Sequence, residues 1–430
     1  MEKVVILGAG LAGLSCAYHL RDGYEIYEKE AEAGGLCRSK DIDGFTFDYD
    51  AHLVHFKNSY TLDLLKTLMD GNLAPHNRDS WIFSKGVFTR YPFQANFYGF
   101  PEDVIKECIS GLARTKRSDV PKSHDGDGLT FEDWILGTFG EGIAKHFMFP
   151  YNNKFWTVHP SQLTCEWIGR YIPITTFEEA LNGALNDKVS KIGYNSQFWY
   201  PIEGGIMEVP LAFERKIKKV SLSKEAIRID VAKKEVTFSD GEKVKFDRLI
   251  STLPLPEMGR LIHPLPESLL SAFRKLKYLS IFNLNLGIDR ENISDRHWIY
   301  FPEEEFIFFR VGFPMNFSPL LIPVGNSSIY AEVSYSKMRP IDKSSLTQRI
   351  VEDLIKGGII YKEDTIKAVD VVDIKYGYII YDRNYRKSVS VILNFLAEND
   401  IFSIGRYGRW RYMSMEDVIL DGKQTAQMFL

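Results

Sequence analysis

Three glycines near the start of the chain have the spacing of a dinucleotide-binding turn. Gly8, Gly10 and Gly13 follow a short apolar run, residues 3–7, and lead into a segment with helical periodicity, residues 14–20. Gly8 permits a tight turn, Gly10 lets a pyrophosphate approach the backbone, and Gly13 lets the helix pack closely on the strand. The free N–H groups and the positive dipole end of that helix would then face the phosphates. This stretch therefore predicts the phosphate-binding turn of a β-α-β unit.

An acidic residue after the next expected strand completes this motif. Residues 24–27 form the expected second strand, and Glu28 follows them, about 20 positions after Gly8. A carboxylate in this place accepts hydrogen bonds from the two hydroxyl groups of a ribose. Because the strand, the helix and the acidic residue all have the required spacing, a dinucleotide site is favoured over a purely structural glycine turn.

A second glycine pair distinguishes the kind of dinucleotide. Gly34 and Gly35 are followed by Arg38 and Ser39, and together with Glu28 this pattern resembles the FAD-binding amine-oxidase-like superfamily more than the NAD dehydrogenases. FAD is therefore the expected cofactor. Near the end of the chain, another glycine would let the backbone come close to the flavin. The expected FAD-binding residues are Gly8, Gly10, Gly13, Glu28, Gly34, Gly35, Arg38, Ser39 and Gly405.

The composition is that of an ordinary globular protein with more than one domain. The 430 residues are many for a single core, and the fractions of hydrophobic residues (45%) and charged residues (26%) are usual for a folded chain. A net charge of −4 argues against a general nucleic-acid surface. The four cysteines form no CxxC pair and lack metal-ligand spacing, which predicts reduced thiols and no metal site.

The start of the chain and its hydropathy favour a cytoplasmic protein. Met1 is followed almost at once by the first expected strand, which leaves no room for a signal peptide. No apolar run approaches the ~20 residues needed to span a bilayer. We therefore expect a cytoplasmic location and no membrane span. The oligomeric state stays open, and a homo-oligomer is compatible with the sequence.

The order of helical and strand-like segments predicts the α/β class. Residues 101–112 and 130–149 have helical periodicity, whereas residues 220–252 and several runs within 275–385 have strand-like patterns. We expect a Rossmann-like FAD-binding domain with a helical insertion and a second, antiparallel β-sheet substrate domain. The expected ranges are 1–90, 200–270 and 390–430 for the discontinuous FAD-binding domain, 91–199 for the mainly helical nucleotide and substrate domain, and 271–389 for the β-sheet domain.

Several side chains outside the glycine motifs could contact a flavin or a nucleotide. His52 ends a strand-like stretch, residues 45–52, which in FAD enzymes of this superfamily passes close to the flavin ring. Tyr91 and Gln94 lie in an aromatic and amide cluster beside a proline, and such a cluster could stack on and hydrogen-bond a nucleobase. Such residues are often structural, so at this point both interpretations stay open.

Five motifs occur in an order that points to one family. They are Tyr91-Pro92-Phe93-Gln94; Pro150-Tyr151-Asn152 with Lys154 and Trp156; Trp298, Tyr300, Phe301 and Pro302; Phe309-Arg310; and Gly405-Arg406-Tyr407-Gly408 with Trp410, Arg411 and Tyr412. With these motifs the sequence resembles the UDP-galactopyranose mutase family, more the longer eukaryotic type than the short bacterial one. The resemblance extends from Val4 to about Gly422.

The resemblance implies a flavin-dependent isomerase. These mutases interconvert UDP-galactopyranose and UDP-galactofuranose, or a related nucleotide-linked sugar, by attack of N5 of reduced FAD on the anomeric carbon. A reductant such as NAD(P)H must first reduce the flavin. By resemblance, the catalytic residues are Arg310, Arg406 and His52, and a guanidinium fork suits a diphosphate leaving group. By the same resemblance, the substrate-binding residues are Tyr91, Gln94, Asn152, Trp156, Arg170, Tyr300, Tyr378 and Tyr412.

Three departures from the family pattern weaken the assignment of UDP-galactose as the substrate. The family's Gly-Gly-His loop is Asp50-Ala51-His52 here, Arg170 lies one position before the expected place of a second diphosphate arginine, and Phe317 replaces a tyrosine. An FAD-dependent amine oxidase or desaturase, which would need an apolar site, is the alternative function. A flavoprotein scaffold without activity is the third. The sequence does not specify the sugar, the base or the reductant.

Overall fold

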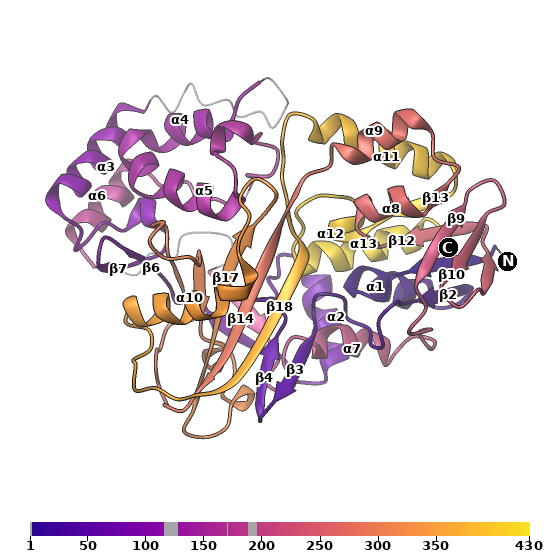
Figure 1. Ribbon diagram of the computed structural model, residues 1–430, viewed down its shortest axis with the longest axis horizontal. Coiled ribbons are helices and arrows are strands. Elements are labelled where there is room, and N and C mark those ends of the chain that lie inside the picture. Colours follow the sequence, from indigo (N-terminus) through magenta and orange to yellow (C-terminus); the bar gives the residue numbers. More distant parts are fainter. Residues whose placement is uncertain (1, 116–127, 170, 188–195) are drawn as a thin grey trace.

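A parallel sheet carries the glycine-rich turn near the start of the chain (Figure 1). The computed structural model describes residues 2–115, 128–169, 171–187 and 196–430. The strands of this sheet lie in the order β19-β12-β1-β2, and all neighbours are parallel. Strand β1 has a neighbour on each side and is buried along its whole length, as an apolar run without alternation predicts. The bounds are Val4–Leu7 for β1, Tyr24–Tyr27 for β2, Arg248–Ser251 for β12 and Ile401–Ser403 for β19.

The helix after the glycine turn lies close to the sheet because one of its residues has no side chain. Helix α1 (Leu11–Leu20) follows the turn directly, and helix α13 (Met415–Gln427) packs against it. A Cβ atom at Gly13 would lie 2.0 Å from the carbonyl oxygen of Gly8. No side chain fits there, so the prediction that Gly13 permits close packing of helix on strand is confirmed.

A seven-stranded sheet forms the centre of the molecule (Figure 1). Its order is β18-β14-β17-β16-β15-β6-β7, and all neighbours are antiparallel except β15 and β6. Helix α10 (Lys343–Lys356) packs on this sheet, where Leu346, Ile350 and Leu354 join an apolar cluster with residues of β14 and β17. The bounds are Ser80–Ser84 for β6, Val87–Arg90 for β7, Tyr278–Ile288 for β14, Trp298–Tyr300 for β15, Arg310–Gly312 for β16, Ser327–Tyr335 for β17 and Ile366–Ile379 for β18.

The position of β6 and β7 corrects the expected end of the first FAD-binding segment at residue 90. This hairpin extends the edge of the seven-stranded sheet, where Ser80 pairs in parallel with Trp298 of β15. Alternation in a sequence predicts a strand but not the sheet that it joins, because the partner strand is distant along the chain. The other expected domain boundaries stay predictions.

The helices within residues 91–199 form one cluster beside the central sheet, at the upper left of Figure 1. Two of them begin with a capping box, in which the side chains of Thr130 and Thr176 each accept a hydrogen bond from the backbone N–H three residues later. A short π-helical turn, Ala144–Met148, leads into α5. The bounds are Glu102–Arg114 for α3, Phe131–Ile143 for α4, Phe149–Trp156 for α5 and Phe177–Leu185 for α6.

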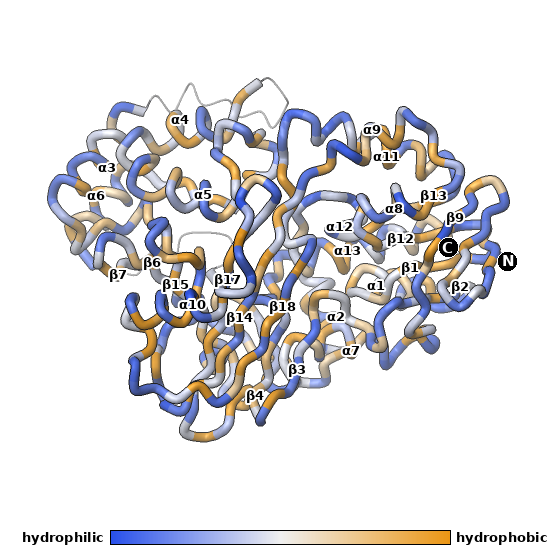
Figure 2. Tube along the Cα trace, viewed as in Figure 1, coloured by the Kyte–Doolittle hydropathy of each residue, from blue (hydrophilic) through white to orange (hydrophobic). Residues whose placement is uncertain are grey.

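Smaller elements complete the fold, and hydrophobic residues follow the inner strands while many outer loops are hydrophilic (Figure 2). Among the residues that the structure describes, no helix combines the length and the apolarity that a membrane crossing requires. The remaining helices are α2 (Ser59–Met69), α7 (Glu208–Glu214), α8 (Leu255–Leu261), α9 (Glu267–Arg274), α11 (Tyr385–Glu398) and α12 (Gly405–Gly408). The remaining strands are β3 (Ser39–Ile42), β4 (Phe45–Asp48), β5 (Ala74–Asn77), β8 (Gln197–Tyr200), β9 (Ala226–Asp230), β10 (Glu235–Phe238), β11 (Lys243–Lys245) and β13 (Ile262–His263).

Candidate active site

One cavity of about 970 Å³ extends from the glycine-rich turn to the seven-stranded sheet. Its walls come from segments that are far apart in the sequence: the turn after β1, the loop after β4, helix α5, strands β15, β16 and β18, and helix α12. This volume is at the upper end of the usual range for small-molecule sites, as an extended ligand requires. The predicted site residues that line it are Gly8, Gly10, Glu28, Gly34, Gly35, Arg38, His52, Tyr91, Gln94, Asn152, Trp156, Tyr300, Arg310, Tyr378, Gly405, Arg406 and Tyr412.

Glycine backbone and the Glu28 carboxylate line the end of the cavity at the glycine turn. Gly8 has a φ of +95°, and a Cβ atom there would lie 2.1 Å from the hydroxyl oxygen of Thr252. A Cβ atom at Gly35 would lie 3.1 Å from the Cα atom of Gly10, so the two glycine segments touch backbone to backbone. The Glu28 carboxylate is held by the N–H of Ala9 at 2.8 Å. A pyrophosphate on the turn and a ribose at Glu28 fit this arrangement.

The other expected cofactor residues differ in their positions. Arg38 lines the cavity, and its Nε donates to the carbonyl oxygen of Gly35 at 2.8 Å. Gly405 also lines the cavity, with a φ of +76°. Ser39 does not, because its hydroxyl group donates to the Asp48 carboxylate at 2.7 Å and so holds the β3–β4 hairpin.

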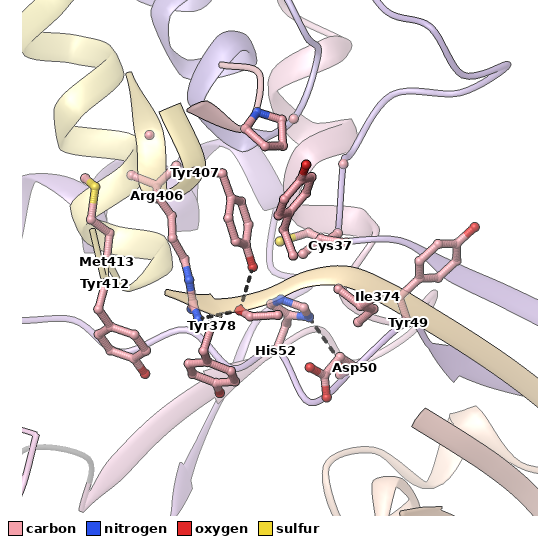
Figure 3. A pocket seen from close by; sticks show the side chains of 18 of the residues that line it. Cys37, Tyr49, Asp50, His52, Ile374, Tyr378, Arg406, Tyr407, Tyr412 and Met413 are labelled. Carbon is pink, nitrogen blue, oxygen red and sulfur yellow. Dashed lines mark hydrogen bonds between the residues drawn. The ribbon is translucent and has the colours of Figure 1, made fainter. Parts of the chain in front are cut away.

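A cage of tyrosine rings surrounds the Arg406 guanidinium group (Figure 3). Its central carbon is 4.6 Å from the ring centre of Tyr378, 4.5 Å from that of Tyr412 and 5.5 Å from that of Tyr407. One nitrogen, Nη2, donates to the carbonyl oxygen of Gly377 at 3.1 Å, whereas Nε is buried without a hydrogen-bond partner. Among the described residues no carboxylate forms an ion pair with Arg406, so its guanidinium charge faces the cavity without a paired side chain.

The second predicted catalytic arginine is paired with a carboxylate. Arg310 donates to both carboxylate oxygens of Glu332, through Nε and, at 2.8 Å, through Nη2. Burial opposes the charged form, but the Glu332 carboxylate raises the pKa of Arg310, so the guanidinium group stays protonated. Its remaining nitrogen, Nη1, makes no hydrogen bond with the described residues. Arg310 thus has one nitrogen left for a ligand, and most of its charge is offset.

His52 lies on a loop below Arg406 and Tyr407 as drawn in Figure 3. Its Nδ1 is 3.2 Å from the carbonyl oxygen of Asp50, which assigns the ring proton to Nδ1 and leaves Nε2 as an acceptor. Burial lowers the pKa of His52, and the Asp50 carboxylate acts in the opposite direction. Near neutral pH the imidazole is therefore uncharged.

Tyrosine side chains line the part of the cavity next to Arg310. The ring of Tyr300 is 5.2 Å from that of Tyr91 and 5.6 Å from that of Tyr151. Burial raises the pKa of Tyr91 and of Tyr151, so both hydroxyl groups keep their protons at neutral pH. This wall can stack on flat rings and can also donate hydrogen bonds to oxygen atoms.

The side chains predicted to bind a nucleoside lie together at the α5 end of the cavity. The Nδ2 of Asn152 donates to the carbonyl oxygen of Met148 at 2.8 Å, and the Nε2 of Gln94 donates to that of Pro173 at 2.5 Å. Both amides are therefore held in one orientation. Trp156 is 2% exposed, and its indole N–H is buried without a partner. An unused buried donor of this kind is usually satisfied by a ligand or by water.

Arg170, Phe317 and Glu332 complete the comparison between the predicted and the observed site residues. Arg170 lies outside the described residues. Phe317 is buried against Phe198 and Tyr200 and does not line the cavity. A tyrosine at position 317 in the same orientation would therefore not contact a ligand in the cavity. Glu332, the partner of Arg310, was not predicted. The sequence did contain a signal for Glu332: it is the only acidic residue in a strand that otherwise consists of apolar and small polar residues and tyrosines.

Comparison with known proteins identifies the family. The family model described as flavin containing amine oxidoreductase matches residues 11–427. The chain belongs to this family. A crystal structure of reduced UDP-galactopyranose mutase has a TM-score of 0.92 and 29% identity over 100% of this chain and 94% of that chain. FAD is therefore the cofactor, and the fold is the α/β FAD-binding fold of amine oxidases.

Some of the more distant relatives carry the names of oxidative enzymes, and another is named a probable UDP-galactopyranose mutase, from Klebsiella pneumoniae. The 4,4'-diapolycopene oxygenase of Methylomonas sp is 24% identical over 71% of this chain and 67% of that protein. Four other curated relatives are matched over 64% or less of their length. Putrescine oxidase bound to putrescine has a TM-score of 0.68 at 15% identity, over 100% of this chain and 98% of that chain, and so shares the fold. The family and the fold alone therefore leave the reaction undecided.

Proposed function

We propose that this chain is a nucleotide-sugar mutase that interconverts the pyranose and furanose forms of UDP-galactose or a related nucleotide-linked sugar. The observation that carries the proposal is the unpaired charge of Arg406 inside the cavity. A buried cation with an unsatisfied nitrogen is costly without an anion, and the diphosphate of a nucleotide sugar is an anion of suitable size. The similarity to reduced UDP-galactopyranose mutase over the whole chain supports the same function.

The side chains around Arg406 would bind and orient the substrate. Arg406 and the Nη1 nitrogen of Arg310 would neutralise the diphosphate as it leaves the sugar. Burial raises the pKa of Tyr378, so its hydroxyl group stays protonated and can donate to phosphate oxygens. Tyr300 and Tyr412 would add further donors, and the surrounding rings exclude water from the sugar.

The bound cofactor would supply the nucleophile. When reduced, FAD offers an electron-rich nitrogen to the anomeric carbon of the sugar, and no net oxidation results. Gly8, Gly10 and Glu28 would hold the dinucleotide, and Gly405 would let the backbone approach the flavin. The neutral His52, with its free Nε2 acceptor, would orient a neighbouring N–H or O–H group. We also propose that NAD(P)H or a similar reductant reduces the flavin before catalysis.

A second candidate function is oxidation of an amine, and one observation favours it. The Asp50 carboxyl group lines a cavity rich in tyrosine rings, and this combination can bind an ammonium group. An amine has no use for the unpaired positive charge of Arg406, which would repel it. The mutase is therefore the better supported of the two.

Ligand-induced stabilisation of the FAD-bound protein separates the two functions. The melting temperature should rise with UDP, GDP or dTDP and their sugars, and not with putrescine or related amines. At a hundredfold excess over Kd, a ligand that binds the native state adds about 2.7 kcal/mol of stability. The proposal fails if no nucleotide raises the melting temperature, and if an amine both raises it and is oxidised with uptake of oxygen.

A further inference from the structure

Lys154 is a buried charged residue that has no part in the proposed reaction. It lies on α5, is 2% exposed and does not line the cavity. Its Nζ donates to the carbonyl oxygens of Phe301 at 2.8 Å, of Phe308 at 3.2 Å and of Glu303. Among the described residues no carboxylate forms an ion pair with Lys154. An ammonium group has three N–H donors, so these three carbonyl groups occupy all of them.

The three carbonyl groups belong to one short loop, residues 301–309, which joins β15 to β16 and is called the β15–β16 loop below. The residue before this loop is Tyr300 and the residue after it is Arg310, and both line the cavity. In the proposed function both side chains contact the diphosphate. The position of the loop therefore decides where these two side chains meet a ligand.

Helix α5 carries side chains that would bind the other end of the same ligand. Asn152 and Trp156 are four residues apart, so they lie on one face of the helix, and both line the cavity where the nucleoside would bind. Lys154 is two residues from each, which is a rotation of about 200° around the helix, and it points to the β15–β16 loop instead. One face of α5 thus forms the nucleoside wall, and Lys154 attaches this helix to the loop between Tyr300 and Arg310.

The β15–β16 loop is itself held by neighbouring elements. The Glu303 carboxylate accepts a hydrogen bond from the N–H of Lys85, at the turn between β6 and β7, at 3.0 Å. The Asp353 carboxylate of α10 accepts one from the N–H of Ile307 at 2.7 Å. The loop therefore has a fixed place on the central sheet, and Lys154 joins the cluster of helices to that fixed place.

Aromatic contacts between α5 and the loop cannot set this arrangement as tightly. The ring of Phe155 is 5.1 Å from that of Phe309, and such pairs tolerate centroid separations of about 4.5–7 Å. Hydrogen bonds from one nitrogen to three carbonyl oxygens weaken steeply when their lengths and angles change. Lys154 is therefore the contact that fixes the position of the helix on the loop.

We infer that Lys154 is a positioning residue for nucleotide binding, which sets the distance between the nucleoside wall on α5 and the diphosphate-binding side chains of Tyr300 and Arg310. This role rests on the proposed function. A ligand that spans two subsites gains affinity when their spacing matches its length, and it loses this gain when the subsites are displaced, even where each subsite stays intact. Loss of Lys154 should therefore weaken binding of a whole nucleotide more than binding of its parts.

Calorimetric titration of the oxidised FAD-bound protein with UDP, with uridine and with inorganic pyrophosphate tests this role. Uridine occupies only the nucleoside subsite and pyrophosphate only the diphosphate subsite, whereas UDP requires both at their correct spacing. The titrations are made at pH 6, because burial lowers the pKa of Lys154 to about 7 and the ammonium form predominates below that value. Where GDP or dTDP binds the wild type more tightly than UDP does, that nucleotide and its nucleoside replace UDP and uridine.

Two variants remove the ammonium group. In Lys154→Met the Kd for UDP should rise at least about tenfold, while the Kd values for uridine and pyrophosphate change by less than about twofold. Lys154→Gln keeps N–H donors on a shorter side chain and should show the same selective loss to a smaller extent, which covers the case that the methionine variant folds poorly. Ile392→Ala is the control for general destabilisation, since Ile392 is fully buried on α11 and does not line the cavity. All three of its Kd values should equal those of the wild type.

The outcomes separate this role of Lys154 from the proposed function. An unchanged Kd for UDP in the Lys154 variants overturns the inference and leaves the mutase proposal intact. A loss of uridine or pyrophosphate binding as large as the loss of UDP binding also overturns it, because a subsite is then damaged rather than displaced. The same selective loss in Ile392→Ala overturns it too, since general loosening would then suffice. Absence of binding by UDP, GDP and dTDP in the wild type contradicts the mutase proposal itself, and with it the inference.

Discussion

Arg310 and Glu332 occupy directly opposed positions on the antiparallel strands β16 and β17, and the guanidinium group spans both carboxylate oxygens. Glu332 is completely buried, and Arg310 lines the cavity. Glu332 is thus fixed within the central sheet, and Arg310 is exposed to a ligand in the cavity. Glu332 positions Arg310 but also offsets the positive charge of Arg310. The positive charge that has no ion-pair partner is therefore that of Arg406.

Removing the carboxylate of this pair should destabilise the protein strongly. Glu332→Gln leaves the Arg310 guanidinium group buried without its counter-ion, and the loss of one partner of a buried pair costs about 3–5 kcal/mol. Urea unfolding of the FAD-bound protein measures this change. Glu304→Gln is the control, because Glu304 pairs with Arg339 at the surface and its loss should cost no more than about 1 kcal/mol. An equal loss of unfolding free energy in the two variants would show that the buried Arg310–Glu332 pair stabilises the protein no more than a surface ion pair does.

Replacement of the caged arginine should weaken nucleotide binding without unfolding the protein. Arg406→Lys keeps the positive charge. It loses the planar guanidinium group, which lies between the tyrosine rings, and it also loses the several N–H donors of that group. We expect the Kd for UDP to rise about 10- to 100-fold, which corresponds to the loss of one or two charge-assisted hydrogen bonds. Arg411→Lys is the control, since Arg411 belongs to the same segment but is exposed. An unchanged Kd in Arg406→Lys would remove Arg406 from the site.

A side chain at the first glycine of the turn should reduce FAD binding. Gly8→Ala combines a φ of +95° with a Cβ atom 2.1 Å from the Thr252 hydroxyl oxygen. The turn must shift, and its N–H groups then no longer face the pyrophosphate. Absorbance at 450 nm per protein chain gives the FAD content of the purified variant. Gly86→Ala has a similar φ of +76° with nothing near its Cβ atom, and it should retain full FAD. Equal FAD content in both variants would argue against a cofactor role for the turn.

A buried histidine should make the protein less stable in acid. His297 accepts a hydrogen bond from the N–H of Asp79 through Nδ1, and burial, together with His76, lowers its pKa to about 4. Between about pH 6.5 and pH 4 the unfolded chain binds a proton that the folded chain excludes, so stability falls as the pH falls through this window.

The lowered pKa of His297 sets the size of this loss of stability. Between pH 6.5 and pH 4 the free energy of unfolding should fall by at most about 3 kcal/mol. His297→Asn keeps an acceptor but does not titrate, so its stability should decline less than that of the wild type in urea unfolding at pH 4.5, 5.5 and 6.5. Above pH 7.5 the difference between the two proteins should be constant. Parallel pH profiles throughout would exclude His297 as the source of the acid sensitivity.

The dinucleotide-binding turn could be predicted because all its determinants are local. The run before Gly8, the helical spacing after Gly13 and the carboxylate at Glu28 lie within one β-α-β unit, and their order alone places them at one edge of the sheet. The helical character of α3 and α4 was predicted for the same reason, since helical periodicity is a property of consecutive residues.

The arrangement of the candidate catalytic groups could not be predicted from local patterns. Arg310 was identified by resemblance, but its partner Glu332 is set by the register of two strands that are separated along the chain. The hairpin β6–β7 was predicted in the wrong unit because strand pairing with β15 is not encoded in its own alternation. Asp50 was noted as a departure from a family pattern, and its place on the cavity wall follows from the fold.

The most direct test of the account is turnover of UDP-galactopyranose by the FAD-bound protein, assayed after reduction with dithionite and in the oxidised state. Chromatography of the nucleotide sugars shows whether the five-membered ring form is produced. We expect the reduced protein to form UDP-galactofuranose, or the furanose form of a GDP- or dTDP-linked sugar, and we expect no such product from the oxidised protein. Complete lack of a furanose product with all three classes of nucleotide sugar, in a reduced protein with full FAD content, would contradict it.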